Sequence, residues 1–87
     1  MVELNRAVAV AMAEGPAAGL AIADLLLDEP SLTTYHLLPS VRADFLAKLG
    51  RAEEARVEYE RAASLTRNAR ERDLLLERAA ACVPARQ

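Results

Sequence analysis

The stretch 41–65, VRADFLAKLGRAEEARVEYERAASL, constrains the fold more than any other part of the sequence. Apolar residues recur at spacings of three and four on both sides of Gly50, which is typical of two amphipathic helices. They are Val41, Phe45, Leu46 and Leu49 before the glycine, and Ala52, Ala55, Tyr59, Ala62 and Ala63 after it. Glycine tolerates the left-handed conformation in which helices commonly end. The sequence therefore predicts a helical hairpin with Gly50 at its turn.

Two further helices are expected before this hairpin. The first covers residues 2–13 and closes at Gly15, and the second covers 16–28 with Pro16 at its first position, where the missing N–H costs nothing. The core-facing stripe of the first helix is predicted to be Leu4, Val8, Ala11 and Met12, with Ala7 beside it. Gly19 lies inside the second helix, where glycine costs about 1 kcal/mol relative to alanine. Close packing against a neighbouring helix explains it most simply.

The third helix is expected from about Thr33 to Leu49, after a loop at 28–31, and it contains Pro39. An interior proline removes one backbone hydrogen bond and usually kinks the helix. Either the helix bends at this proline, or its regular part begins near Leu38 after a loose turn. The bent helix is the preferred interpretation.

The fourth helix is predicted to end near Thr66, and a fifth to run from Ala69 to about Cys82. Asn68 followed three positions later by Glu71 matches the pattern of a helix N-cap. The apolar face of this last helix is expected to carry Leu75, Ala79 and Cys82, and the tail at 85–87 is expected to fray.

Composition and charge restrict the class of protein. A chain of 87 residues makes one domain, which buries roughly 60–65% of its unfolded surface and leaves no room for an enclosed active site. Aromatic residues are 3% of the sequence, so the core must be built from Ala, Leu and Val. The net charge of −2 argues against direct nucleic-acid binding. Charged residues at helical spacing, as in Glu54–Glu58 and Glu58–Arg61, predict a solvated, ion-paired face.

Several kinds of chemistry find no residues to support them. The single cysteine, Cys82, allows neither an internal disulfide nor a zinc site, and it fits a cytoplasmic setting. No signal pattern precedes the first helix, and the apolar run at 8–13 is too short to span a membrane. His36 is the only histidine, and a packing or capping role is expected for it. We therefore expect no enzyme activity, no catalytic residues, no bound metal and no cofactor.

The turn glycines Gly15 and Gly50 lie 35 residues apart, close to the tetratricopeptide period of about 34. The second unit matches that family's pattern well: Gly50 at the turn, then Ala55, Tyr59 and Ala62, with Ala43 as the small packing residue on the first helix. The first unit departs from the family pattern, with Leu20 where alanine is expected and Asp24 where an aromatic residue is expected. In the second unit, Pro39 replaces a bulky aromatic residue near the start of the helix. The resemblance implies an all-α fold of about five helices, namely two tetratricopeptide-like hairpins plus a C-terminal capping helix, as a single domain over residues 1–87.

A closer resemblance covers nearly the whole chain. The strings LNRAVAVAMAEGPAAGL, YHLLPSVRADFLAKLGR and EARVEYERAASL are similar to the C-terminal extension of one group of bacterial extracytoplasmic-function sigma factors. The hallmark of that group is an Asp-Gly-Pro-Ala-Gly-Leu-type segment, which here is EGPAAGL at 14–20, with Glu14 in place of the aspartate. The resemblance implies that the chain is a cytoplasmic, non-catalytic regulatory module. It also implies that the chain is a fragment of a longer sigma factor and lacks the sigma regions that bind polymerase and promoter.

The expected partners follow from that resemblance: the protein's own sigma regions, core RNA polymerase or a regulator. The hypothesised partner-binding residues are Asn5, Arg6, Glu14, Gly15, Pro16, Gly19 and Leu20. For the segment 14–20, the simpler interpretation is a tight turn between helices. The alternative function is a generic tetratricopeptide-like adaptor or small-ligand sensor unrelated to transcription. Two repeats leave an apolar edge uncovered, and this edge can also support a homodimer.

Overall fold

The computed structural model describes residues 2–28 and 36–82. Within these residues, the chain forms five α-helices and one short 3₁₀ helix, so the expected all-α fold is confirmed. The helices are α1 (Val2–Glu14), α2 (Pro16–Leu25), α3 (Leu37–Lys48), α4 (Ala52–Leu65) and α5 (Ala69–Ala81), with the 3₁₀ helix η1 (Leu26–Asp28) directly after α2. Three expected features lie outside the described residues. They are residues 29–31 of the loop at 28–31, Tyr35, which the sequence predicts in or near the core, and the tail at 85–87.

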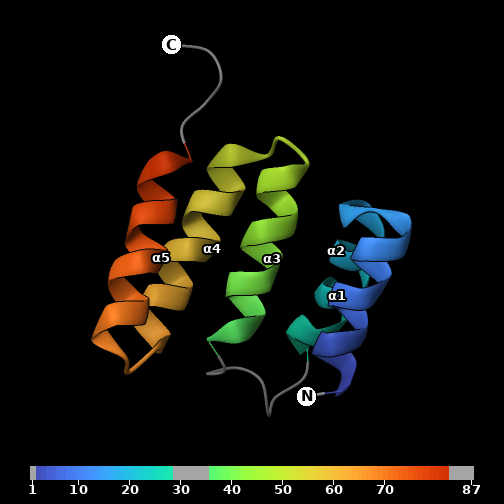
Figure 1. Cartoon of the computed structure of the whole chain (residues 1–87), viewed down its shortest axis with the longest axis horizontal. Helices are drawn as coiled ribbons and strands as arrows, with labels where there is room; N and C mark the ends of the chain where they lie inside the picture. The colour runs from blue at the N-terminus through green and yellow to red at the C-terminus, as the bar shows by residue number, and fades with distance from the viewer. Residues whose placement is uncertain (1, 29–35, 83–87) are drawn as a thin grey trace.

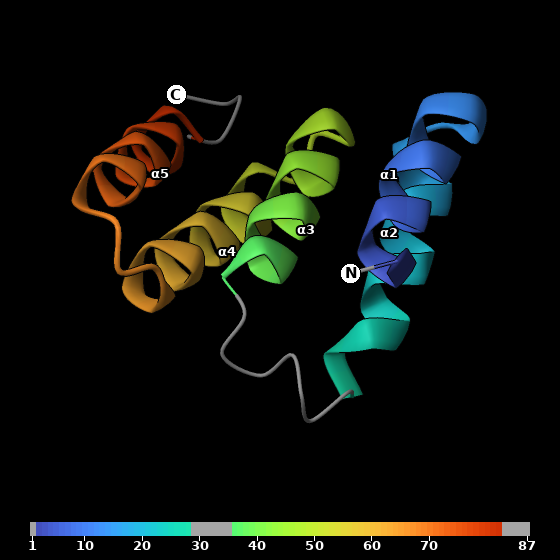
Figure 2. The ribbon, with the colours of Figure 1, turned by 60° about the horizontal axis from the view of Figure 1, so that its bottom comes forward.

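Consecutive helices run in opposite directions, so the two turn glycines lie at the same end of the domain (Figure 1). α1 packs on α2, α3 on α4 and α4 on α5, while the α2–α3 contact joins the first hairpin to the rest. Figure 2 shows the α1–α2 hairpin beside α3, with α4 between α3 and α5. The domain measures 35 × 29 × 19 Å.

Both turn glycines adopt backbone conformations that side chains disfavour. Gly15 has φ 104° and ψ 162°, a region that is essentially restricted to glycine, and Gly50 has φ 81°. A Cβ atom at either position would have open space around it. Backbone conformation, and not crowding, is therefore what favours glycine at these two corners. The predicted hairpin turn at Gly50 and the break at Gly15 are both confirmed.

Pro39 does not kink a helix. α3 begins at Leu37, so the proline is the third residue of its first turn. N–H groups at that position have no partner within the helix, and proline loses nothing there. The preferred interpretation of a bent third helix is therefore wrong for the described residues, and the alternative of a regular start near Leu38 is close to the observed one.

The core confirms most of the predicted faces but corrects the one on α1. Ala7 is fully buried, whereas Val8 is 37% and Met12 is 84% exposed. On α1, Leu4 and Ala7 are buried and Ala11 is partly buried against the core. The prediction is therefore confirmed for Leu4 and Ala11 and wrong for Val8 and Met12. Half of the fourteen buried apolar residues described are alanines: Ala7, Ala23, Ala43, Ala55, Ala62, Ala63 and Ala79. Small side chains therefore let the helix axes approach closely.

The predicted N-cap of α5 is present. The Asn68 side-chain oxygen accepts a hydrogen bond from the Glu71 backbone N–H at 2.9 Å. The return half of a capping box is absent, because the Asn68 backbone N–H donates to the Thr66 hydroxyl at 3.2 Å and the Glu71 carboxylate is occupied elsewhere.

Replacing Asn68 with alanine should lower the free energy of unfolding by about 1 kcal/mol, because the Glu71 N–H loses its acceptor. In thermal denaturation, this corresponds to a fall in midpoint of about 4–8 °C. Asn68→Asp is the matched control, since aspartate caps equally well and should leave the midpoint nearly unchanged. Equal losses in both variants would contradict the capping role.

Candidate functional site

The segment 14–20, singled out by its sequence, forms the corner between α1 and α2. Glu14 is exposed, and Gly15 and Pro16 are partly buried, with Pro16 opening α2. Gly19 and Leu20 are buried inside the domain. A Cβ atom on Gly19 would lie 2.6 Å from the Ala11 Cβ and 2.9 Å from the Ala7 carbonyl oxygen, so the predicted close packing is present. Only the first three of these five residues are therefore available to a partner.

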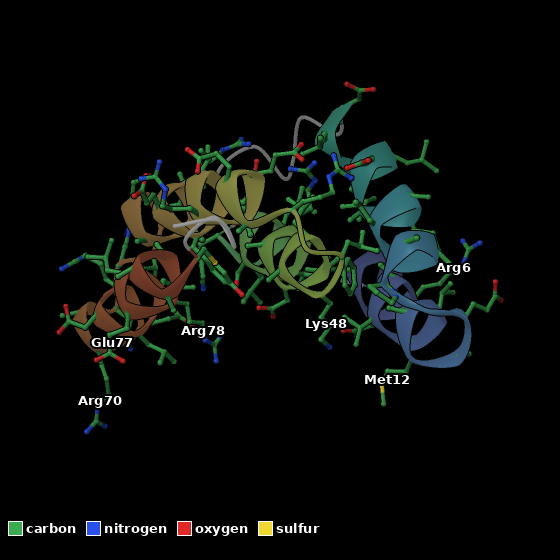
Figure 3. The ribbon with its side chains drawn as sticks, turned by 90° about the horizontal axis from the view of Figure 1, so that it is seen from above. Arg6, Met12, Lys48, Arg70, Glu77 and Arg78 are labelled. Carbon is green, nitrogen blue, oxygen red and sulfur yellow. The ribbon has the colours of Figure 1, made fainter. Side chains whose placement is uncertain are left out.

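The other two hypothesised partner-binding residues, Asn5 and Arg6, lie toward the opposite end of α1. Both are exposed. Ten residues of helix separate Asn5 from Gly15, which corresponds to roughly 15 Å. Figure 3 also shows Arg6 on a different side of the molecule from Met12. The structure does not bring these residues together with the turn, so one small ligand would not contact both.

An apolar groove lies beside the turn. We call it the turn groove; it has a volume of about 100 Å³ and is lined by Val8, Ala11, Met12, Pro16, Phe45 and Lys48. Its floor includes Phe45, which is only 4% exposed, and its rim includes Met12 at 84% exposed. An unbranched thioether side chain adapts to apolar partners of different shapes. The apolar spacing of the sequence predicts that Met12 lies in the core. Sequence reasoning therefore missed the turn groove.

The side of the molecule that carries the turn groove also carries basic residues. Figure 3 shows Met12, Lys48, Arg70 and Arg78 projecting from one side, with α2 and α4 along the other. Within the described part of the chain, Lys48, Arg70 and Arg78 form no ion pair. These three cations are therefore free to interact with a partner, although Glu77 lies among them (Figure 3).

A second groove, which we call the acidic groove, lies over α3 and α4. It has a volume of about 220 Å³ and is lined by Arg42, Leu46, Glu53, Glu54, Val57 and Glu58. Arg42 crosses between helices here: its Nε lies 2.9 Å from an Asp24 oxygen on α2, and its Nη1 lies 2.8 Å from a Glu58 oxygen on α4. Arg42 and Glu58 are each only 14% exposed. The Asp24 contact joins the first hairpin to the second, whereas the Glu58 contact lies within the second hairpin.

The remaining ion pairs on this side are local to α4 and its first corner. Arg51 makes a two-pronged contact with Glu54, at 2.6 and 2.8 Å, and this contact holds the pKa of Glu54 below its usual value. Arg56 contacts Glu53 at 3.1 Å and Glu60 at 3.4 Å. The predicted ion-paired face is thus present, but the Glu58–Arg61 spacing does not produce a pair, because Glu58 is engaged by Arg42.

Tyr59 fastens α4 to α3. Its side chain is buried, and its hydroxyl donates a short hydrogen bond to the Asp44 carboxylate. Burial, together with the adjacent carboxylate, raises the pKa of Tyr59 well above its usual value. The phenol therefore keeps its proton and serves as a structural donor.

His36, Thr66 and Glu71 connect the start of α3 to the start of α5. The His36 Nε2 lies 3.0 Å from a Glu71 oxygen, which also accepts a hydrogen bond from the Thr66 hydroxyl at 2.6 Å. The hydroxyl of Thr66, then the charge and hydrogen bond of His36, lower the pKa of Glu71. His36 thus has a structural partner 35 residues away in sequence, which the sequence pattern could not indicate.

Because the pKa of Glu71 is lower in the folded protein, its contacts stabilise the fold at pH values above the ordinary carboxylate value of 4.5. This contribution is lost as the pH falls through the lowered pKa. Glu71→Gln should therefore reduce stability near neutral pH, and the difference from the parent should shrink below pH 4.5. Urea unfolding at several pH values measures this difference. Glu77→Gln, at an exposed site on the same helix, is the control, and an identical pH profile for the two variants would contradict the assignment.

No group of three or more potential metal ligands occurs among residues 2–28 and 36–82. In the same residues, no helix has the length and apolar character needed to cross a membrane.

Comparisons with known proteins identify a relative for most of the chain. No family model matches the chain, and no solved structure matches it. Over 71 residues, or 82% of this chain, the sequence is 45% identical to an uncharacterized protein of Rhizobium meliloti (strain 1021). The matched region is only 16% of that protein, so the chain spans about a sixth of its relative's length. A segment similar to this domain therefore occurs within a much longer protein.

Proposed function

We propose that this chain is a non-catalytic protein-interaction module of an extracytoplasmic-function sigma factor, built from tetratricopeptide-like hairpins. The observation that carries the proposal is the EGPAAGL segment at 14–20, which resembles the hallmark of that sigma factor group. Each of its special residues has a structural role, because Gly15 adopts its unusual backbone conformation, Pro16 opens α2, and Gly19 permits close helix contact. The relative from Rhizobium meliloti also supports a modular role, because the region that matches 82% of this chain is only 16% of that longer protein.

The tetratricopeptide-like part of the proposal is supported by the arrangement of helices. Two antiparallel hairpins with glycine turns 35 residues apart are followed by a single helix packed on the second hairpin. In such arrays, partners bind as extended segments or helices to the face lined by the first helices of the hairpins. In this proposal that face is the side on which Met12 of α1 and Lys48 of α3 project (Figure 3).

In this proposal the turn groove is the contact point. It lies beside Pro16, in the hallmark segment, and its exposed apolar rim at Met12 is flanked by Lys48. A partner segment with an apolar anchor and an acidic residue beside it fits this combination. The expected partner is the protein's own sigma regions, with core polymerase or a regulator as the alternatives.

Titration calorimetry of this domain against the separately purified sigma regions encoded in the same gene tests the proposal. We expect binding in the micromolar range or tighter, and at least about tenfold weaker binding for Met12→Glu, because a carboxylate would enter an apolar contact. Leu25→Glu is the matched control, since Leu25 is 76% exposed on α2, away from the turn groove. Circular dichroism verifies that both variants are folded.

A gene without sigma regions would overturn the proposal, and so would intact domains that bind neither sigma regions nor core polymerase. The alternative of an adaptor unrelated to transcription would then be preferred. The two grooves of the described residues measure about 220 and 100 Å³, and ligand pockets usually measure about 300–1,000 Å³. Their size disfavours the binding of a small ligand at these two grooves.

A further inference from the structure

One side of α5 carries a regular row of basic and apolar side chains. Arg70, Leu74 and Arg78 follow one another at intervals of four residues, so they lie in line along the helix. Both arginines are exposed, and Leu74 is 46% exposed. We call these three residues the α5 row. From its first to its last residue, the row extends roughly 12 Å along the helix.

The α5 row lies on the docking side of the proposed function. Figure 3 shows both arginines of the row projecting from the same side of the molecule as Met12 of α1 and Lys48 of α3. The contact of α5 with α4 uses other residues, because Leu75 and Ala79 are the buried ones on this helix. The row is therefore not needed for packing within the domain and is open to a partner.

This side is positively charged, although the chain as a whole has a net charge of −2. Lys48 and the two arginines of the row form no ion pair within residues 2–28 and 36–82. Asp44, one turn before Lys48 on α3, already accepts a hydrogen bond from the Tyr59 hydroxyl. Glu77 lies among the cations (Figure 3) and balances only one of the three. The side thus offers more positive than negative charge to a partner.

The spacing of the row matches that of another helix. A complementary ligand needs a carboxylate, an apolar group and a second carboxylate at intervals of about 6 Å. Residues four apart on one face of a partner helix have the same rise as the row itself, so all three contacts stay in register. Arginine is suited to the outer contacts, because its guanidinium binds a carboxylate with two parallel N–H donors.

We propose that the α5 row docks an acidic amphipathic helix of a partner protein. Its carboxylates accept hydrogen bonds from Arg70 and Arg78, and an apolar side chain between them packs on Leu74. The inference deepens the proposed function and rests on it for the choice of docking side, to which it adds the chemistry of the bound segment. Nucleic acid fits less well, because the middle of the row is apolar and Glu77 would repel phosphates.

A second copy of this chain is another candidate occupant. The exposed part of α4 carries Glu53, Val57 and Glu60, in which two carboxylates flank an apolar residue. Both carboxylates are already engaged by Arg56, at 3.1 and 3.4 Å. Self-association through α4 would therefore disrupt an existing ion pair for each new one, and a partner with unpaired carboxylates is preferred.

The test measures fluorescence anisotropy with a labelled, alanine-rich helical peptide that carries glutamate and leucine in alternation along one face. One control peptide has glutamine in place of glutamate. A second control keeps the composition but places the leucines on the opposite face. We expect the glutamate peptide to bind at least about tenfold more tightly than either control. General attraction cannot explain such a result, because the peptide and the whole domain are both negatively charged.

Two matched pairs of variants locate the site on α5. Leu74→Asp should weaken binding at least about tenfold, because its carboxylate would repel those of the peptide, and Arg78→Glu should have a similar effect. Leu76→Asp and Arg72→Glu are the controls and should bind as the parent does. These two residues lie four apart on another side of the helix, and Leu76 is 45% exposed, against 46% for Leu74. Circular dichroism verifies that all four variants are folded.

Four results would overturn the inference. The first is equal affinity for the glutamate and glutamine peptides, and the second is an equal loss of affinity in Leu74→Asp and Leu76→Asp. The third is a dimer of the domain in sedimentation that dissociates in Leu74→Asp, which would make a second copy the occupant. The fourth is tighter binding of duplex DNA than of the glutamate peptide.

Titration of the same variants with the sigma regions separates this inference from the proposed function. Equal binding of the sigma regions to the parent, Leu74→Asp and Leu76→Asp would support the proposed function and exclude the α5 row as the site. Binding of the glutamate peptide at the α5 row without binding of the sigma regions would support the docking chemistry and exclude the sigma factor assignment.

Discussion

Gly19→Ala is expected to lower the midpoint of thermal unfolding by about 10 °C, although alanine is the better helix former. The added Cβ would lie 2.6 Å from the Cβ of Ala11 and 2.9 Å from the Ala7 carbonyl oxygen. Neither atom can move away by side-chain rotation, so α1 and α2 must separate. We place the overpacking cost at about 3 kcal/mol, of which the gain in helix propensity offsets about 1 kcal/mol. The net loss of about 2 kcal/mol gives the shift stated.

The informative control is Ala21→Gly. Ala21 is exposed on the same helix, and there glycine should cost about 1 kcal/mol, as intrinsic propensity dictates. Glycine is thus preferred over alanine at position 19, whereas alanine is preferred over glycine at position 21. If Gly19→Ala melted at or above the parent temperature, the close approach of α1 and α2 at this point would be refuted.

Phe45→Ala should have the largest effect of any substitution considered, about 3–5 kcal/mol. Phe45 is 4% exposed, and its Cζ would lie 2.9 Å from a Cβ on Gly19, so its ring lies between α3 and the α1–α2 hairpin. Domains of this size are stable by only about 5–15 kcal/mol. We expect the amides of α1 and α2 to lose protection from hydrogen exchange before those of α3 to α5.

The ion pair between Arg42 and Asp24 cannot replace this contact. Asp24 is 48% exposed, and partly solvated pairs contribute about 1 kcal/mol or less. Phe45→Leu is the conservative control, with an expected loss of about 1 kcal/mol. Uniform loss of protection across all five helices would show instead that the two hairpins unfold as one unit.

Local features of the fold could be predicted from the sequence, because each depends on residues close together in the chain. Gly15 and Gly50 mark corners through their own backbone preferences, and Asn68 caps a helix three residues away. Pro39 illustrates the limit of such arguments. Its cost depends on where the helix begins, and sequence periodicity does not define a helix start to within one turn.

The grooves could not be predicted, because they depend on contacts between distant segments. Glu58 was expected to join local charges on its own helix, but Arg42 reaches it from another helix. Met12 fits the apolar spacing of α1, yet the rotation of that helix about its axis buries Ala7 and leaves the methionine exposed. Spacing identifies a helix, whereas the packing of the neighbouring helices determines which of two adjacent stripes is buried.

The alanine-rich core also affects how the domain responds to temperature. Seven of the fourteen buried apolar residues described carry only a methyl group, so unfolding exposes little apolar surface for each residue released. Apolar hydration is the source of the large heat capacity of unfolding, usually about 12–15 cal/mol/K per residue. A value below that range gives a flatter stability curve, with stability that changes little on cooling. The domain should thus resist cold denaturation better than proteins of equal size with aromatic cores.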